Sequence, residues 1–207
     1  RDAADRTVIR GIGCGVGGVA SYIEPEFHSK FVGVEISATA CERARATYPG
    51  ATYVCAAAEE FRTDEKFDLV VAIEAIEHWT NVPPILAAMR DALSPEGYCL
   101  ISTPNADSLH LRMADKLGIP RFTCCNEHIH EFGFDELTEV MARAGFEPVA
   151  AKGVLLLPYW GLERDFGHKA RALSDNDPAM LQMLVDLGRT CDPKYAFGQV
   201  RTFRLAR

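Results

Sequence analysis

A glycine-rich segment between two apolar runs constrains the fold of this chain more than any other feature. Residues 13–18 read Gly-Cys-Gly-Val-Gly-Gly, and Glu35 follows about 20 residues later, at the end of the next apolar run. Glycines allow a tight turn and close approach of a ligand, and amides at the start of a helix attract anionic or polar groups. A carboxylate after the second strand is placed to accept hydrogen bonds from ribose hydroxyls. The segment therefore predicts a site for a cofactor that contains adenosine.

Apolar runs alternate with helix-like segments along the whole chain, which predicts an α/β fold with a parallel, doubly wound sheet. Residues 69–73 are all apolar, as expected of a central strand covered on both faces. Residues 199–205 alternate between polar and apolar, which indicates an antiparallel edge strand. The expected strands are 7–12, 30–35, 52–55, 67–73, 98–103, 146–152 and 199–205, and the expected helices are 18–23, 39–47, 83–93, 135–144 and a segment near 178–187.

Two long connections interrupt this alternation, at residues 106–133 and 153–198. Connections of such length in a compact domain are usually lids or binding loops. No internal repeat, low-complexity tract or linker divides the sequence. We therefore expect residues 1–207 to form a single domain, with the two insertions forming a lid over the substrate.

Charge and cysteine content narrow the classes of partner and compartment. The formal net charge of −7 provides no general attraction to nucleic-acid phosphates. The apolar stretches have the length of strands, and the polar N-terminus lacks the apolar segment of a signal peptide. The 7 cysteines, an odd number, are typical of buried thiols in a reducing compartment. We expect a cytoplasmic protein with a small-molecule substrate, without a nucleic-acid or membrane partner; a homodimer is left open.

The glycines satisfy two templates. Gly13, Gly15 and Gly18 fit the GxGxxG of dinucleotide-binding proteins, whereas Gly13, Gly15 and Gly17 fit a GxGxG pattern. Taken alone, the glycines leave the choice between these templates open.

Three later passages separate the two templates. Residues 67–78 read FDLVVAIEAIEH, residues 93–105 read LSPEGYCLISTPN, and residues 128–146 begin with HIHEF and end with AGF. In order and spacing they resemble the region from the fourth to the sixth strand of class I S-adenosylmethionine-dependent methyltransferases. The pattern is most similar to that of ubiquinone-biosynthesis O-methyltransferases and natural-product methyltransferases. The resemblance implies a Rossmann-like seven-stranded sheet with an antiparallel last strand, and methyl transfer from S-adenosylmethionine.

The resemblance also implies a set of cofactor contacts, with two departures from the family pattern. Gly11 stands where the family usually has a carboxylate that helps to hold the methionine end of the cofactor, and its neighbour Arg10 lies in a strand that should be buried. Ala57 stands where an aspartate often contacts the adenine amino group. The implied cofactor residues are Gly13, Cys14, Gly15, Gly17, Glu35, Ile36, Ala58, Glu59 and Glu74.

Carboxylates and histidines after the fourth expected strand suggest how an acceptor is activated. An oxygen nucleophile usually needs a base or a metal to lower its pKa. In a helix Glu74, Glu77 and His78 would share one face, and with His128 or His130 they could hold a divalent cation such as Mg²⁺. The pattern resembles the metal site of small-RNA 3′-end 2′-O-methyltransferases. We expect Glu74, Glu77, His78 and His130 as metal ligands and His78, His130 and Glu77 as catalytic residues; a metal-free base, His78 or His130, is the alternative.

Three hypotheses for function stay open at this stage. The first is an S-adenosylmethionine-dependent methyltransferase acting on a hydroxyl or amine of a small molecule in secondary metabolism, such as antibiotic biosynthesis. The second is a metal-dependent RNA 2′-O-methyltransferase, which requires a basic track for RNA. The third is a nicotinamide oxidoreductase, or a methyltransferase-like protein that binds the cofactor without catalysis.

Overall fold

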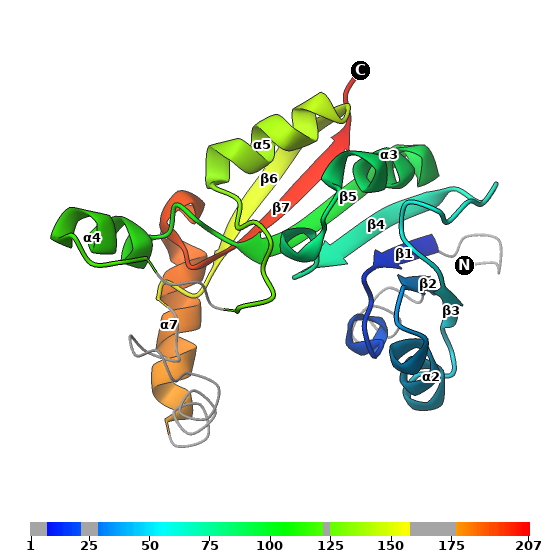
Figure 1. Ribbon diagram of the computed structural model, residues 1–207, viewed down its shortest axis with the longest axis horizontal. Coiled ribbons are helices and arrows are strands. Elements are labelled where there is room, and N and C mark those ends of the chain that lie inside the picture. Colours follow the sequence, from blue (N-terminus) through cyan, green and yellow to red (C-terminus); the bar gives the residue numbers. More distant parts are fainter. Residues whose placement is uncertain (1–7, 22–28, 122–124, 158–176) are drawn as a thin grey trace.

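A mixed sheet forms the centre of the molecule (Figure 1). The computed structural model describes residues 8–21, 29–121, 125–157 and 177–207. Within these residues the sheet has 7 strands in the order β3-β2-β1-β4-β5-β7-β6. The strands β1 to β5 pair in parallel, and β7 runs antiparallel to both β5 and β6. The predicted Rossmann-like, seven-stranded sheet with an antiparallel last strand is therefore confirmed.

The strands and helices occupy most of the positions expected from the sequence. The strands are β1 (Val8–Ile12), β2 (Lys30–Glu35), β3 (Thr52–Cys55), β4 (Phe67–Ile73), β5 (Leu93–Pro104), β6 (Phe146–Val154) and β7 (Gly198–Leu205). The helices are α2 (Ala38–Thr47), α3 (Val82–Ala92), α4 (Leu109–Leu117), α5 (Phe134–Arg143) and α7 (Pro178–Thr190), with short 3-10 helices η2 (Ile76–His78) and η3 (Pro193–Tyr195). Residues 18–21 are also helical, and the remainder of the helix expected at 18–23 lies outside the described residues.

Two elements differ from expectation for local reasons. The strand β5 begins at Leu93 rather than at residue 98, because Leu93 already pairs with Phe67 of β4 before a register shift. The helix α4 lies within the insertion 106–133, which was expected only as a lid, and it ends where Gly118 adopts the left-handed conformation with φ 67°. Residues 122–124 and 158–176 of the two insertions lie outside the described residues.

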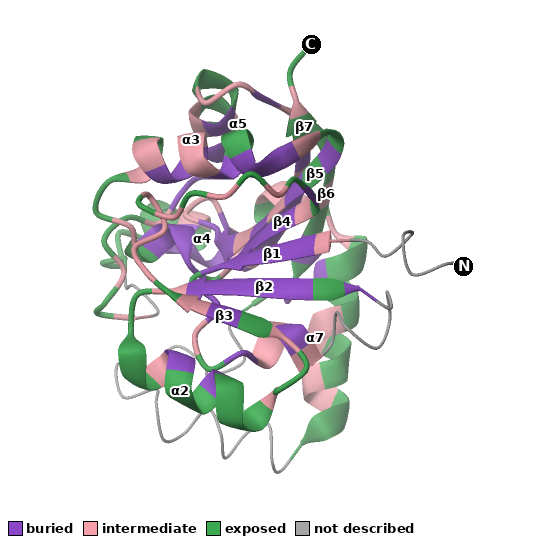
Figure 2. Cartoon of the chain, turned by 90° about the vertical axis from the view of Figure 1, so that its right-hand side faces the viewer, coloured by how far each residue is buried: buried purple, intermediate pink, exposed green. Residues whose placement is uncertain are grey.

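Helices cover both faces of the sheet, as its apolar strands require. Figure 2 shows α3 and α5 on one face and α2 and α7 on the other. On the first face Phe67 of β4 packs with Met89 of α3 and Leu137 of α5. On the second face Phe31 of β2 packs with Ala44 of α2. The sheet is therefore a rigid support, and the loops at the carboxyl ends of its parallel strands are free to bind ligands.

The helix α7 approaches β6 more closely than ordinary side chains would allow. A Cβ atom added at Gly153 would lie 2.2 Å from the backbone oxygen of Gly188, and one added at Gly188 would lie 2.3 Å from the backbone nitrogen of Leu155. Contacts below 3.0 Å to backbone require the chain to shift. Glycine at both positions therefore lets α7 rest on the sheet.

Candidate functional site

The loop after β1 requires glycine at three positions. Gly13, Gly15 and Gly17 have φ values of 62°, 52° and 85°, in the left-handed region. A Cβ atom at Gly17 would also lie 2.6 Å from the hydroxyl oxygen of Tyr53, whereas one at Gly18 would meet nothing within 4 Å. The structure thus needs glycine at 17 rather than 18, which matches the methyltransferase template instead of the dinucleotide one.

Glu35 lies against this loop, as the sequence predicts. Its Oε2 atom accepts a hydrogen bond from the backbone N–H of Gly15 at 2.9 Å, and its Oε1 atom accepts one from the N–H of Ser37 at 2.9 Å. Ile36, beside it, exposes 73% of its surface. The end of β2 therefore offers a fixed carboxylate for polar groups and an apolar surface for a flat ring.

The segment after β3 lies next to Glu35. The N–H of Ala56 donates to the backbone oxygen of Glu35 at 3.1 Å, which brings Ala57, Ala58 and Glu59 to the same edge of the sheet. Glu35 therefore lies between the glycine loop and this segment. We expect an adenosine group to bind at such a place.

Packing explains why Gly11 replaces the family's carboxylate. A Cβ atom at Gly11 would lie 2.5 Å from Cζ of the buried Phe31 ring, so the aromatic ring occupies the space that a side chain would take. Cys14 is also buried, and burial together with the charge of Glu35 raises the pKa of its thiol to about 12. Cys14 is thus a protonated packing residue, and its contribution to a cofactor is limited to its backbone.

Glu74 closes the end of β4 in a strained conformation. Its φ of 47° is rare for a residue with a side chain. Its N–H donates to the backbone oxygen of Ser102 at 2.9 Å, and its carboxylate accepts a short hydrogen bond from the Ser102 hydroxyl. Strain of this kind gathers at functional sites, and it turns Glu74 toward β5.

Glu77 is the most deeply buried carboxylate of the site. It is 0% exposed; its Oε2 accepts a hydrogen bond from the Thr103 hydroxyl at 3.0 Å, and its Oε1 has no partner among the described residues. Burial raises the pKa of Glu77, and the charge of Glu74 adds to this. Its backbone oxygen accepts the N–H groups of Ile129 and His130 at 2.8 and 3.1 Å, which docks the first insertion onto η2.

Glu77 lies with two histidines rather than with the expected set of four residues. One ligand atom from each of Glu77, His78 and His128 lies within 4.8 Å of the others. His78 and His128 meet edge to face, with ring centroids 4.9 Å apart. His130 lies outside this group: its Nε2 atom is 2.7 Å from Oε1 of Glu136, because Glu136 caps the start of α5 beside it.

Hydrogen bonds orient both clustered imidazoles. Nδ1 of His78 lies 3.1 Å from the backbone oxygen of Glu127, and Nδ1 of His128 lies 2.8 Å from Oε1 of Glu131. Because a carbonyl oxygen and a carboxylate only accept, Nδ1 is the donor in each neutral ring. The lone pair then resides on Nε2, where it can accept a proton or bind a metal.

Asn105, which the sequence analysis treated only as part of a motif, has a structural role. The residue is 1% exposed, and its Nδ2 donates to the backbone oxygens of Lys194 and Ala196 at 2.9 and 3.0 Å. Its Oδ1 accepts the N–H of Asp107 at 2.9 Å. Asn105 therefore joins the exit of β5 to η3, a contact between residues about 90 positions apart that no local pattern reveals.

Among the described residues no helix is both long and apolar enough to cross a membrane.

Comparisons with known proteins relate the chain to one family. The family described as "Methyltransferase domain" matches residues 11–151. A ubiquinone biosynthesis O-methyltransferase of Bradyrhizobium sp. (strain ORS 278) is 30% identical over 173 residues, covering 74% of this chain and 65% of that protein. The protein of the same name from Rhodopseudomonas palustris (strain BisB5) is 33% identical over 100 residues, covering 45% of this chain and 38% of that one. The match therefore spans less than two thirds of either relative.

A solved structure shows the same fold at low sequence identity. The TehB-like SAM-dependent methyltransferase from Corynebacterium glutamicum ATCC 13032 Kitasato aligns with a TM-score of 0.59 and 17% identity, covering 96% of this chain and 80% of that one. At this identity the likeness concerns the fold alone, because one fold carries many activities.

Proposed function

The chain belongs to the methyltransferase domain family, within the class I S-adenosylmethionine-dependent methyltransferases, and on this premise we propose that it methylates a hydroxyl or amine of a small molecule. The observation that carries the proposal is the placement of Glu35 on the glycine loop, at the same sheet edge as Glu74 and Glu77. Cofactor residues and acid–base residues then border a common space, as methyl transfer requires.

The cofactor would lie along the ends of β1, β2 and β3. Glu35 would accept hydrogen bonds from the ribose hydroxyls, and Ile36 would cover one face of the adenine ring. The backbone of Ala58 and Glu59 would meet the adenine edge in place of the family's aspartate side chain. Glu74 would face the methionine end, together with the backbone of the loop residues Gly13, Cys14, Gly15 and Gly17.

The acceptor would be deprotonated by an imidazole. When bound, S-adenosylmethionine would supply an electrophilic methyl group on its sulfur for in-line displacement by the acceptor oxygen. The proton of the acceptor hydroxyl moves to Nε2 of His78, whose Nδ1 is held by Glu127. The carboxylate of Glu77 stabilises the resulting imidazolium. His130, paired with Glu136, takes no part in this step.

Glu77, His78 and His128 together also fit a divalent cation. Glu77 and the two histidines combine a carboxylate with two imidazoles, and the buried Oε1 of Glu77 has no partner among the described residues. Such a donor set suits Mn²⁺ or Zn²⁺ better than Mg²⁺, which prefers oxygen ligands. When bound, the cation supplies Lewis acidity that lowers the pKa of an acceptor hydroxyl.

The printed names of the relatives support an oxygen acceptor. We propose a small hydroxylated compound, bound in the cytoplasm beneath α4 and α7, and extend the proposal to secondary metabolism because both insertions are elaborate. The net charge of −7 argues against an RNA substrate.

Calorimetric titration with S-adenosylhomocysteine tests the cofactor, with and without Mn²⁺. We expect micromolar binding, and a gain in affinity or activity with Mn²⁺ if Glu77, His78 and His128 hold the cation. An absence of S-adenosylhomocysteine binding would contradict the proposed activity. If a chelator leaves both binding and turnover unchanged, the metal takes no part in the reaction and His78 alone acts as the base.

A further inference from the structure

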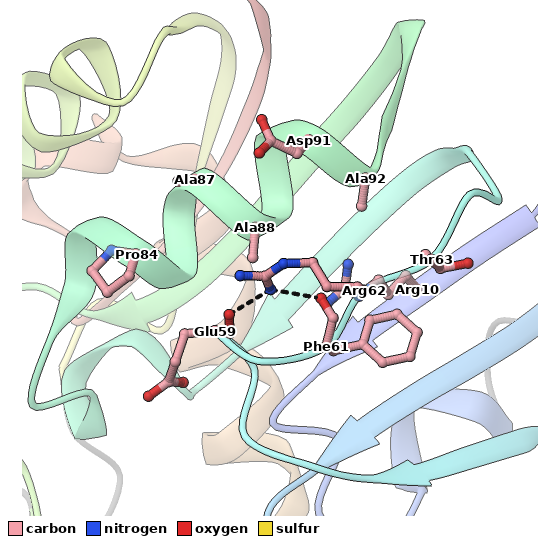
Figure 3. A pocket seen from close by; sticks show the side chains of 10 residues that line it. All are labelled: Arg10, Glu59, Phe61, Arg62, Thr63, Pro84, Ala87, Ala88, Asp91 and Ala92. Carbon is pink, nitrogen blue, oxygen red and sulfur yellow. Dashed lines mark hydrogen bonds between the residues drawn. The ribbon is translucent and has the colours of Figure 1, made fainter.

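A pocket separate from the glycine loop lies beside α3 (Figure 3). Its volume is about 200 Å³, and its walls come from α3, from the segment 59–63 and from the side chain of Arg10 on β1. Arg10 points to the α3 face of the sheet, whereas Gly11 faces Phe31 on the other side. Of the expected cofactor residues, Glu59 is the one that also lines this pocket. A ligand here would therefore be distinct from one held by Glu35.

Arg10 brings to this pocket a buried cation that forms no ion pair with any described residue. The residue is 1% exposed, and its Nε and Nη2 atoms have no hydrogen-bond partner in the described part of the chain. Its guanidinium lies 4.4 Å from the ring centroid of Phe61 and 5.9 Å from that of Phe67. Cation–π contacts offset only part of the cost of removing a charged group from water. The buried charge of Arg10 is therefore only partly compensated by the described residues around it.

Arg62 adds a second positive charge. Its Nη1 donates to the backbone oxygens of Glu59 and Phe61 at 2.5 and 3.0 Å, and these bonds hold its guanidinium across the pocket (Figure 3). Burial, reinforced by the charge of Arg62, lowers the pKa of Arg10 to about 10. The two cations are thus close enough to repel each other.

The carboxylates at the rim do not neutralise these cations. Asp91 accepts hydrogen bonds from Nε and Nη2 of Arg90 at 3.1 and 3.0 Å. Figure 3 shows the carboxylates of Asp91 and Glu59 directed away from the Arg62 guanidinium. Arg10 and Arg62 therefore line the pocket without forming an ion pair among the described residues, although Glu59 and Asp91 also belong to its walls.

We propose that this pocket binds a phosphate group, with Arg62 donating hydrogen bonds to its oxygens and the buried guanidinium of Arg10 contributing its positive charge. A phosphate carries about −1.5 to −2 charges at pH 7, which matches two guanidinium groups. The planar fork of arginine fits phosphate oxygens in pairs. A volume of about 200 Å³ holds several waters of about 30 Å³ each, which leaves room for the first atoms of a phosphate ester.

Titration of the purified chain with inorganic phosphate in a chloride buffer, followed by calorimetry and thermal unfolding, tests the proposal. At ten times its Kd, phosphate should raise the Tm by about 3–6 °C. Arg10→Met should abolish this shift and, in the absence of phosphate, unfold at a higher temperature, because a buried charge is replaced by an apolar chain. Arg62→Met, at an exposed position, should weaken phosphate binding about tenfold and guards against misfolding of the first variant. Arg43→Met, exposed on α2, is the matched control and should bind like the unsubstituted chain.

The outcomes separate the site from general charge attraction. Phosphate binding by Arg10→Met and Arg62→Met with the affinity of the unsubstituted chain, or no binding by the unsubstituted chain, would overturn the proposal. If saturating S-adenosylhomocysteine displaces the bound phosphate, the phosphate lies in the cofactor site. This result would also overturn the proposal. A parallel titration with glycerol 3-phosphate distinguishes the sources: tighter binding than inorganic phosphate supports a phosphorylated metabolite, and weaker binding supports the free ion.

Discussion

The hydroxyl of Thr103 donates a hydrogen bond to the carboxylate of Glu77, with 3.0 Å between Oγ1 and Oε2, and both residues are 0% exposed. Thr103 belongs to β5 and Glu77 to η2, so this bond ties the loop after β4 to the neighbouring strand. The backbone of Glu77 also holds the first insertion through Ile129 and His130. Glu77 therefore sets the position of the group Glu77, His78 and His128 relative to the sheet.

Replacement of Glu77 by glutamine should impair catalysis without loosening the cofactor site. Glutamine keeps the size of the side chain and the hydrogen bond from Thr103, but it removes the negative charge beside His78 and His128. We expect kcat to fall about 100-fold or more, with unchanged affinity for S-adenosylhomocysteine. Steady-state kinetics and calorimetry measure the two quantities.

Thr103→Val provides the matched control for Glu77→Gln. It removes the donor and keeps the Glu77 carboxyl group, whose pKa rises further without this hydrogen bond, and it should lower the free energy of unfolding by about 1–3 kcal/mol. A normal kcat in Glu77→Gln would exclude the carboxylate from the reaction.

Glu35 should determine cofactor affinity. Glu35→Ala removes the carboxylate that accepts from Gly15 and from the proposed ribose. Loss of hydrogen bonds to a charged group should weaken S-adenosylhomocysteine binding about 10- to 100-fold. Calorimetry measures this, with Glu42→Ala, on the exposed side of α2, as the control. Equal affinities in the two variants would place the cofactor elsewhere.

The alternation of strands and helices was predictable from local signals, and the family resemblance implied the seven-stranded sheet with an antiparallel last strand. Consecutive apolar residues predicted the central strand β4, which the structure contains. Alternation predicted an antiparallel edge strand at 199–205; the direction is confirmed, but the edge position is wrong, because β7 pairs with both β5 and β6 and β6 lies at the edge. The position of Glu35 on the glycine loop was also predictable, because parallel strands end at a common edge. The helix α4 was missed although its buried residues His110, Leu111 and Ala114 lie on one face, because the whole segment 106–133 was interpreted as a loop-like insertion.

The side-chain partners of the site depended on contacts that sequence spacing does not encode. The choice between His128 and His130 was set by Glu136, which attracts His130 at the start of α5. The Phe31 ring explains why residue 11 is glycine, and the Phe61 ring explains how the buried Arg10 is accommodated. In each case the deciding neighbour comes from another element, so tertiary packing rather than local pattern fixed the outcome.

Adjacent glycines in the loop should differ sharply when each is replaced by alanine. Gly17 has a φ of 85°, and a Cβ there would lie 2.6 Å from the Tyr53 hydroxyl, so Gly17→Ala should lower the free energy of unfolding by about 1–3 kcal/mol. Gly18 has open space and begins a helical segment, so Gly18→Ala should be neutral or slightly stabilising. Denaturant titration of both variants measures this. Equal losses would show that the loop does not depend on the left-handed turn.

The buried imidazole of His110 should make the protein less stable in mild acid. Burial, aided by the charge of Arg121, lowers the pKa of His110 from 6.5 to about 4. Between these values the unfolded chain binds a proton that the folded chain rejects, so stability falls as the pH drops below 6.5 and levels off near 4. Between pH 7 and pH 5 this linkage should remove about 2 kcal/mol. Denaturant titrations measure the free energy of unfolding at both pH values. Its decrease from pH 7 to pH 5 should be about 2 kcal/mol smaller in His110→Gln than in the unsubstituted chain, because glutamine does not titrate. Parallel losses in the two proteins would mean that His110 is protonated in the folded state as readily as in the unfolded one.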